Sequence, residues 1–216
     1  MQSGLLKYSG FVSLFLGHLL AFGLPTIANA QQRPGISASV QKSILLEPGV
    51  PLLGPTSADV TVIEYFDYNC PFCKALAPVF HSFVEKDRTA AVLFKEWPVF
   101  GGVSVYAAQL ALAANFQGKY LQAHDALMGA PRLAENSQVD SALAGAGIDM
   151  ARLKRDLIAH QASIDGLLMR NDAEARALGL RGTPGILVGR KIVPDVSSLE
   201  ALQSAVALFR RSDVKQ

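Results

Sequence analysis

Two cysteines, Cys70 and Cys73, are the residues of this 216-residue chain whose type and spacing most clearly point to chemistry. The chain has no other cysteine, which excludes a multi-disulfide scaffold and a four-cysteine zinc or iron–sulfur site. Two residues separate the pair, so the two sulfurs can reach disulfide distance across a single helical turn. The spacing therefore predicts either a redox-active dithiol or a short structural disulfide.

A predicted strand and a predicted helix position this pair. The run DVTVIEYF at 59–66 is β-branched and aromatic, as in a buried strand, and the apolar residues after Cys73 recur at helical spacing. Pro71 suits the first turn of a helix because it has no amide hydrogen to lose there. The helix N-terminus favours an anion, so we expect a lowered pKa for Cys70. Cys73, one turn inside, is expected to be the more buried, resolving thiol.

The rest of the pattern alternates between strand and helix signals. Further strands are predicted at 90–97, 185–189 and 191–194, a continuous helical block at 104–179, and a last helix at 197–211. A strand–helix–strand unit makes a parallel pair, whereas two strands joined by a tight turn must be antiparallel. These elements predict an α/β protein with one mixed sheet flanked by helices and an all-helical insertion.

The segments FDYNCPFCK and GLRGTPGILVG resemble those of the DsbA-like thiol-disulfide oxidoreductases, in the exported branch with the pattern FxDYxCPxCK. The resemblance runs from about Leu46 to Arg211 and includes the helical insertion. It implies a thioredoxin fold with a helical domain inserted, and thiol-disulfide exchange on exported proteins. It implies no cofactor.

The resemblance also suggests an acid and base pair near the cysteines. Glu64 precedes Cys70 by six residues on a strand that otherwise reads as buried, where the family carries an acid beneath the disulfide. Lys95 on the neighbouring strand is similar to the lysine that pairs with that acid. A buried carboxylate with a raised pKa can relay the proton of the resolving cysteine. An ordinary ion pair at the strand ends is the alternative.

Substrate contacts are expected at Phe72, Thr183 and Pro184. Thioredoxin-like proteins place a cis-proline opposite the disulfide, and the residue before it offers its backbone to the substrate as an added strand. From the sequence pattern alone, without the resemblance, Pro184 would be interpreted as an ordinary proline at the start of a strand. Phe72, Tyr68 and Trp97 are candidates for an apolar rim that binds unfolded chains. For Tyr68 and Trp97, the alternative is that they pack in the core.

The first thirty residues have the three parts of a secretory signal peptide: a positive charge at Lys7, an apolar stretch, and a small-x-small exit ending at Ala30. An uncleaved membrane anchor is the alternative, but the apolar stretch is shorter than the roughly 20 residues that span a bilayer. We expect a periplasmic or secreted protein. The expected divisions are a signal peptide at 1–30, an extended lead-in at 31–58, a thioredoxin-like domain at 59–103 and 180–216, and the insertion at 104–179. We interpret the lead-in as a linker with at most one short helical stretch, around Val40 to Leu46.

Composition narrows the function further. The net charge is +2 without a run of basic residues, which argues against nucleic-acid binding, and 50% hydrophobic residues argue against disorder. His81, His124 and His160 stand alone on predicted helices, so we interpret them as surface or structural residues. We predict no metal site.

The direction of exchange follows from weaker signals. The Pro-Phe dipeptide lacks the histidine of the family's strongest oxidants, and threonine also precedes the cis-proline in isomerases, so both features favour a milder potential. Isomerase-like members carry long helical stalks for oligomerisation, and the stretch from Ala30 to Val60 is too short for one. We therefore expect a monomer and an oxidase, with an isomerase or reductase as the alternative.

The expected partners are unfolded or reduced exported proteins and an unidentified redox partner, either a membrane quinone-linked oxidase or a membrane reductase. A more remote alternative is a binding module or chaperone in which Cys70 and Cys73 form a static disulfide. Closing so short a loop gains little chain entropy, which disfavours a purely structural bridge.

Overall fold

A computed structural model describes residues 35–194 and 196–213 of the chain. The predicted signal peptide and its cleavage point after Ala30 lie outside these residues. Within the described part, no helix has both the length and the apolar composition needed to cross a membrane.

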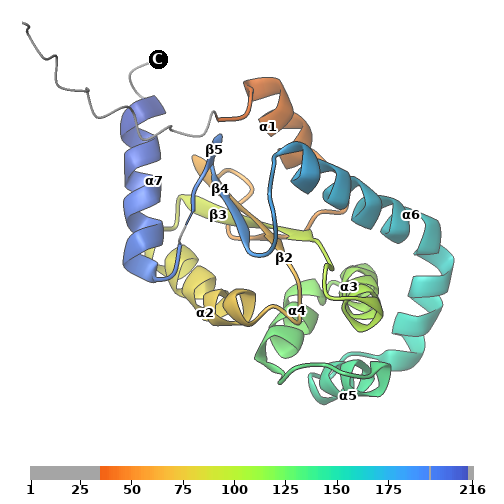
Figure 1. Ribbon diagram of the computed structural model, residues 1–216. Helices are drawn as coiled ribbons and strands as arrows, with labels where there is room; N and C mark the ends of the chain where they lie inside the picture. The colour runs from red at the N-terminus through yellow and green to blue at the C-terminus, as the bar shows by residue number, and fades with distance from the viewer. Residues whose placement is uncertain (1–34, 195, 214–216) are drawn as a thin grey trace, which may run out of the picture. The chain divides into compact units, whose positions relative to one another are not determined.

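A five-stranded mixed sheet forms the centre of the fold, as Figure 1 shows. Its strand order is β1-β3-β2-β4-β5. The central strands β2 and β3 are parallel, and every other neighbouring pair is antiparallel. The strands are β1 (Leu52–Leu53), β2 (Val60–Phe66), β3 (Ala90–Glu96), β4 (Gly185–Val188) and β5 (Lys191–Ile192). This arrangement confirms the predicted α/β thioredoxin-like fold.

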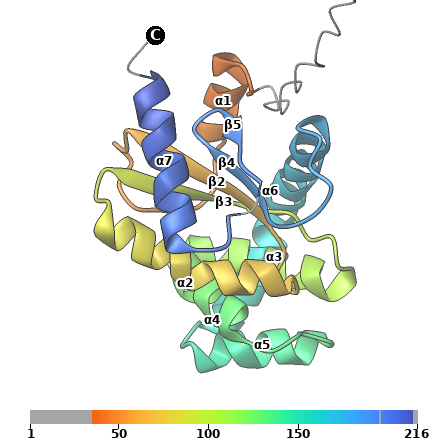
Figure 2. The ribbon, with the colours of Figure 1, turned by 60° about the vertical axis from the view of Figure 1, so that its left-hand side comes forward.

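Helices cover both faces of the sheet (Figures 1 and 2). One face carries α2 and α7, which pack on each other, and the other carries α1 and the C-terminal turns of α6. The helices are α1 (Ala38–Leu45), α2 (Pro71–Lys86), α3 (Gly102–Ala114), α4 (Tyr120–Gly129), α5 (Asn136–Gly145), α6 (Met150–Ala177) and α7 (Leu199–Asp213), with a 3-10 turn η1 (Asn115–Gln117) after α3.

Alternation along β2 sorts its side chains between two cores. Val62 and Phe66 belong to the larger core with α2, α7 and the helical insertion, whereas Ile63 and Tyr65 belong to the smaller core with α1 and α6. Successive strand residues point to opposite faces, so Glu64 shares the face of Val62 and Phe66. The acid therefore lies on the side of the sheet that α2 covers.

The described part of the lead-in contains the short helix predicted around Val40 to Leu46 and is otherwise more ordered than an extended segment. Its helix α1 buries Ile44 to 1% exposure in the smaller core, and β1 pairs with β3 at the edge of the sheet. A strand of two residues is too short to show a period in the sequence, which explains why this fifth strand is not predicted. The lead-in is thus part of the packed fold rather than a linker.

The insertion is helical as predicted, from α3 to α6. The 28-residue helix α6 begins in the insertion and ends against the sheet, where Ala175 joins the smaller core. The domain boundary at 179 and 180 stays a prediction. The last turns of α6 already pack as a flanking helix of the thioredoxin-like part.

Candidate active site

Cys70 is the N-cap residue of α2, directly after β2 and its turn. Its sulfur accepts a hydrogen bond from the backbone N–H of Cys73 at 3.5 Å, and Pro71 occupies the first turn as predicted. Both cysteines are buried and unpaired, so the geometry describes the dithiol form. An N-cap sulfur faces the unpaired amides of the first helical turn, and these amides favour a negative charge on it.

The two thiols have opposite acidities. The hydrogen bond from the Cys73 thiol, together with backbone amides of the first turn, lowers the pKa of Cys70 to about 6 against the opposing effect of burial. Burial raises the pKa of Cys73 far above its ordinary value, helped by the hydrogen bond to Cys70 and the nearby charge of Glu64. At neutral pH, Cys70 is therefore a thiolate and Cys73 a thiol, an asymmetry that suits a nucleophile and a resolving cysteine.

The Thr183–Pro184 peptide bond is cis and lies opposite the start of α2. In its protonated form, the thiol of Cys70 donates a hydrogen bond to the carbonyl oxygen of Thr183 at 3.3 Å. Strand β4 begins at the next residue, Gly185, and its antiparallel pairing with β2 brings this loop to the cysteines. The register of β4 is thus what joins the two segments of the site.

An apolar groove borders the cysteine motif. It has a volume of about 470 Å³, and Phe72, which is 72% exposed, forms part of its wall. The lining residues come from the start of α2, from β4 and from the loop before α7: Phe72, Ala75, Leu76, Pro184, Ile186, Val193, Pro194, Val196 and Ser197. An exposed aromatic side chain beside an apolar hollow suits contact with hydrophobic side chains of another chain.

Tyr68 and Trp97 are core residues rather than parts of a rim. Tyr68 is 1% exposed and Trp97 is 4% exposed. The indole N–H of Trp97 donates to Asp172 Oδ1 at 2.9 Å, on the face of the sheet away from the cysteines. Of the three predicted aromatic residues, only Phe72 is available to a partner.

Glu64 lies beneath the cysteines with its carboxyl group fully buried. Burial raises its pKa well above the ordinary value, and the charges of Cys70 and Glu96 raise it further. Its Oε1 atom has no hydrogen-bond partner among the described residues. A buried acid with a raised pKa that interacts with Cys73 can exchange a proton with that thiol.

The expected pairing of Glu64 with Lys95 is wrong. The parallel register places Glu64 opposite Phe94 and Tyr65 opposite Lys95, so Lys95 projects from the other face of the sheet. There its Nζ lies 2.8 Å from Glu174 Oε2. Lys95 joins the lead-in and α6 to the sheet and does not reach the cysteines.

A buried acid that the sequence pattern did not single out lies on the same face as Glu64. Glu96 ends β3, is 1% exposed, and accepts hydrogen bonds from the hydroxyls of Tyr68 at 2.9 Å and Tyr120 at 2.8 Å. His124 packs against this group, with its Nδ1 at 3.2 Å from the Tyr68 oxygen. The sequence contained one signal for this position. Residues two apart on a strand share a face, so Glu96 had to lie on the same face as Phe94.

The lysine of the CPFCK segment braces the start of α2. Lys74 Nζ donates to the carbonyl oxygens of Leu127 and Ala130, each at 2.8 Å, at the C-terminal end of α4. Carbonyls at a helix end lack intrahelical partners, and a cation satisfies them. This contact ties the cysteine helix to the helical insertion.

The fold, the cis-proline loop and the acidic N-cap thiol define a thiol-disulfide oxidoreductase of the thioredoxin type. The chain belongs to the DsbA-like family, since the DSBA-like thioredoxin domain matches residues 61–207.

Two of three individual relatives have names that agree with this assignment. A thioredoxin-like oxidoreductase from Silicibacter pomeroyi is 36% identical, with a TM-score of 0.74 over 79% of this chain and 97% of that one. The thiol:disulfide interchange protein DsbA of Pseudomonas aeruginosa is 28% identical over 71% of this chain and 73% of its own length. A Na⁺/H⁺ antiporter of Salinispora arenicola is 26% identical over 87% of this chain, which spans only 29% of the antiporter's length.

Proposed function

We propose that this chain is an exported disulfide oxidase, which passes a Cys70–Cys73 disulfide to reduced cysteine pairs in other exported proteins. The observation that carries the proposal is the N-cap position of Cys70, where hydrogen bonds lower the pKa of its thiol to about 6. A more stable thiolate makes the corresponding disulfide more oxidising. This pKa falls between the roughly 7 of thioredoxin and the roughly 3.5 of a strong oxidant, and it is nearer to that of thioredoxin.

In the proposed mechanism, a substrate thiolate attacks the Cys70 sulfur of the enzyme disulfide. The sulfur–sulfur bond breaks, Cys73 leaves with the electron pair, and Glu64 gives it a proton. A second substrate thiolate then attacks the substrate sulfur of the mixed disulfide. A substrate disulfide forms, and Cys70 leaves as a stable thiolate.

Substrate binding is proposed at the apolar groove and the cis-proline loop. Phe72 and the groove receive hydrophobic side chains that unfolded proteins expose, and Thr183 and Pro184 present an extended backbone to the substrate. The reduced enzyme is recharged by a membrane redox partner. We further propose export to the periplasm through the signal peptide at 1–30, and a monomeric protein.

Trapping of mixed disulfides tests this function. In Cys73→Ser, the mixed disulfide at Cys70 has no resolving thiol, so covalent adducts with reduced exported proteins should accumulate on non-reducing gels. Cys70→Ser is the matched control and should give no adducts and no exchange activity. An active Cys70→Ser protein would refute the mechanism, and a static disulfide that resists millimolar glutathione would indicate a structural bridge instead.

A further inference from the structure

Two carboxyl groups on neighbouring strands are buried on the cysteine side of the sheet. Glu64 and Glu96 stand on the adjacent parallel strands β2 and β3, and the register pairs Phe66 with Glu96, two positions along from Glu64. Both side chains therefore project from the face that α2 covers. Each is 1% exposed.

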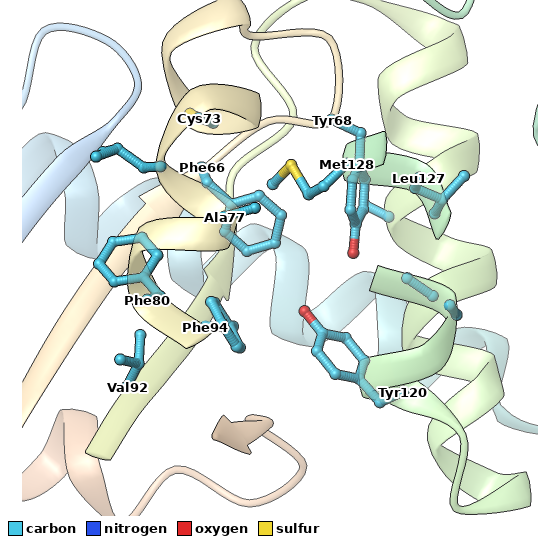
Figure 3. Packing of buried hydrophobic residues seen from close by; sticks show 14 of the residues in the cluster. Phe66, Tyr68, Cys73, Ala77, Phe80, Val92, Phe94, Tyr120, Leu127 and Met128 are labelled. Carbon is cyan, nitrogen blue, oxygen red and sulfur yellow. The ribbon is translucent and has the colours of Figure 1, made fainter. Parts of the chain in front are cut away.

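The surroundings of the two acids differ. Glu64 Oε1 has no hydrogen-bond partner in the described part of the chain, whereas Glu96 Oε1 accepts two phenol hydroxyls at 2.9 and 2.8 Å. Figure 3 shows the hydroxyl ends of Tyr68 and Tyr120 turned toward the same space between β3 and α4. Hydrogen bonds to a carboxylate stabilise its charged form, so Glu96 is the better place for a negative charge.

We propose that Glu96 is a positioning residue that stores the proton exchanged between Glu64 and Cys73. When the enzyme disulfide opens, Cys73 leaves as a thiolate and takes the proton of Glu64. Glu64 is reprotonated from Glu96, and the negative charge passes to Glu96 between the two hydroxyls. When the disulfide closes, the same proton moves back from Cys73 to Glu64 and from Glu64 to Glu96. No proton, electron or co-reactant is left over.

The charge properties of the pair support this assignment. Burial raises the pKa of Glu96 to about 8 although both tyrosine hydroxyls lower it, and Asp67 raises it slightly. The charge of Glu96 in turn contributes to the raised pKa of Glu64, so a charge on Glu96 disfavours a second charge on Glu64. Two coupled acids of this kind hold one charge more readily than two.

The groups that face Glu96 come from every neighbouring element. Glu64 stands on β2, Asp67 and Tyr68 follow it in the turn, and Tyr120 stands on α4. His124, also on α4, has a pKa lowered to about 3 by burial, so it is neutral at the pH of interest. Glu64 and Glu96 are therefore the two carboxyls of this set whose pKa is raised by burial, and Cys70 is the further charge that acts on Glu64.

Rapid-quench kinetics of the full chain with oxidised glutathione test the inference, which rests on the proposed function. The first step forms the mixed disulfide at Cys70, and the second, in which Cys73 displaces glutathione, requires loss of the Cys73 proton. Acid quenching, alkylation and mass measurement separate the two rate constants across pH 6 to 10. Failure of the first step would contradict the proposed function, whereas the second step alone reports on Glu96.

In the wild type, the second rate constant should rise with a midpoint near the Glu96 pKa of about 8. In Glu96→Gln the midpoint should move to higher pH, and the rate constant at pH 8 should fall about tenfold, a fraction of the roughly 10²- to 10⁴-fold contribution of positioned acid–base groups. The first rate constant should not change. The exposed Glu85→Gln makes the same chemical change elsewhere and should match the wild type.

Two results would overturn the inference. An unchanged profile would mean that Glu96 has no part in the proton transfer, and a midpoint at lower pH would mean that it only repels charge on Glu64. The double variant Glu64→Gln/Glu96→Gln should be no slower than Glu64→Gln, because Glu96 acts through Glu64. If Glu96→Gln does not fold, Tyr120→Phe removes one donor, keeps the carboxyl group and should also move the midpoint to higher pH.

Discussion

The Cys70 sulfur lies 3.3 Å from the carbonyl oxygen of Thr183, to which the protonated thiol donates, although the two residues are 113 positions apart in the chain. One partner caps the helix that follows β2, and the other lies in the cis-proline loop just before β4. The site therefore depends on the antiparallel pairing of these two strands, with the whole helical insertion between them in sequence.

The reactivity of Cys70 should depend on pH as expected for a stabilised thiolate. Alkylation of the reduced protein by iodoacetamide should rise with pH through a midpoint near 6 and be nearly constant from pH 7 to 8, because only the thiolate reacts. Mass mapping should find the label on Cys70, with Cys73 unreactive until the protein unfolds. A midpoint near the ordinary thiol value would contradict the proposed stabilisation at the helix N-terminus.

Removal of the exposed aromatic ring should weaken substrate binding without altering the thiols. Phe72→Ala should raise KM for an unfolded, reduced protein substrate about tenfold, as expected for loss of an aromatic anchor at an interface. The Cys70 alkylation midpoint should stay the same. Ile158→Ala removes a similarly exposed apolar side chain from α6 and serves as the control. Equal KM values for the two variants would argue against the groove as the binding site.

Burial of Glu64 should make the fold less stable as pH rises. Its folded-state pKa is raised, so its contribution to stability is fully present below the unfolded-state pKa near 4.5 and is lost progressively above it. Glu64→Gln should therefore increase the free energy of unfolding at pH 8 by about 1–3 kcal/mol, and much less at pH 5. Urea unfolding of the reduced form at both pH values measures this. A gain of equal size at both would exclude ionisation as the cause.

Lys95 should contribute to the stability of the fold and have no effect on the pKa of the Cys70 thiol. Its amino group is fully buried against Glu174, so Lys95→Met should lower the free energy of unfolding by about 3 kcal/mol, because it leaves a partly buried acid without its partner. The alkylation midpoint of Cys70 should be unchanged, since Lys95 projects from the opposite face of the sheet. A shift in the Cys70 alkylation midpoint would mean that Lys95 influences the active site.

The parts of the site that depend on local pattern could be predicted from the sequence. The spacing of Cys70 and Cys73, the strand before them and the proline after Cys70 all act within a few residues, and the structure has them as expected. The mixed sheet also followed from the order of elements and the tight turn between the last strands.

The parts that depend on register could not be predicted in the same way. Whether Glu64 and Lys95 share a face is decided by which residue of β3 stands opposite Glu64, and only the paired strands show that this residue is Phe94. Every residue of β3 is buried, so the strand has no polar and apolar alternation to mark its faces. Alternation along β3 puts Glu96 on the face of Phe94, but its tyrosine partners come from the turn after β2 and from α4, and the pattern of one strand does not reveal them.

The equilibrium reduction potential of the Cys70/Cys73 pair tests the central claim most directly. The reduced and oxidised forms would be equilibrated in glutathione buffers, quenched, alkylated and counted by mass. A disulfide donor should have a potential nearer the roughly −120 mV of strong oxidants than the roughly −270 mV of thioredoxin. A value at the thioredoxin end would contradict the oxidase assignment and indicate a reductase or isomerase that needs a supply of electrons.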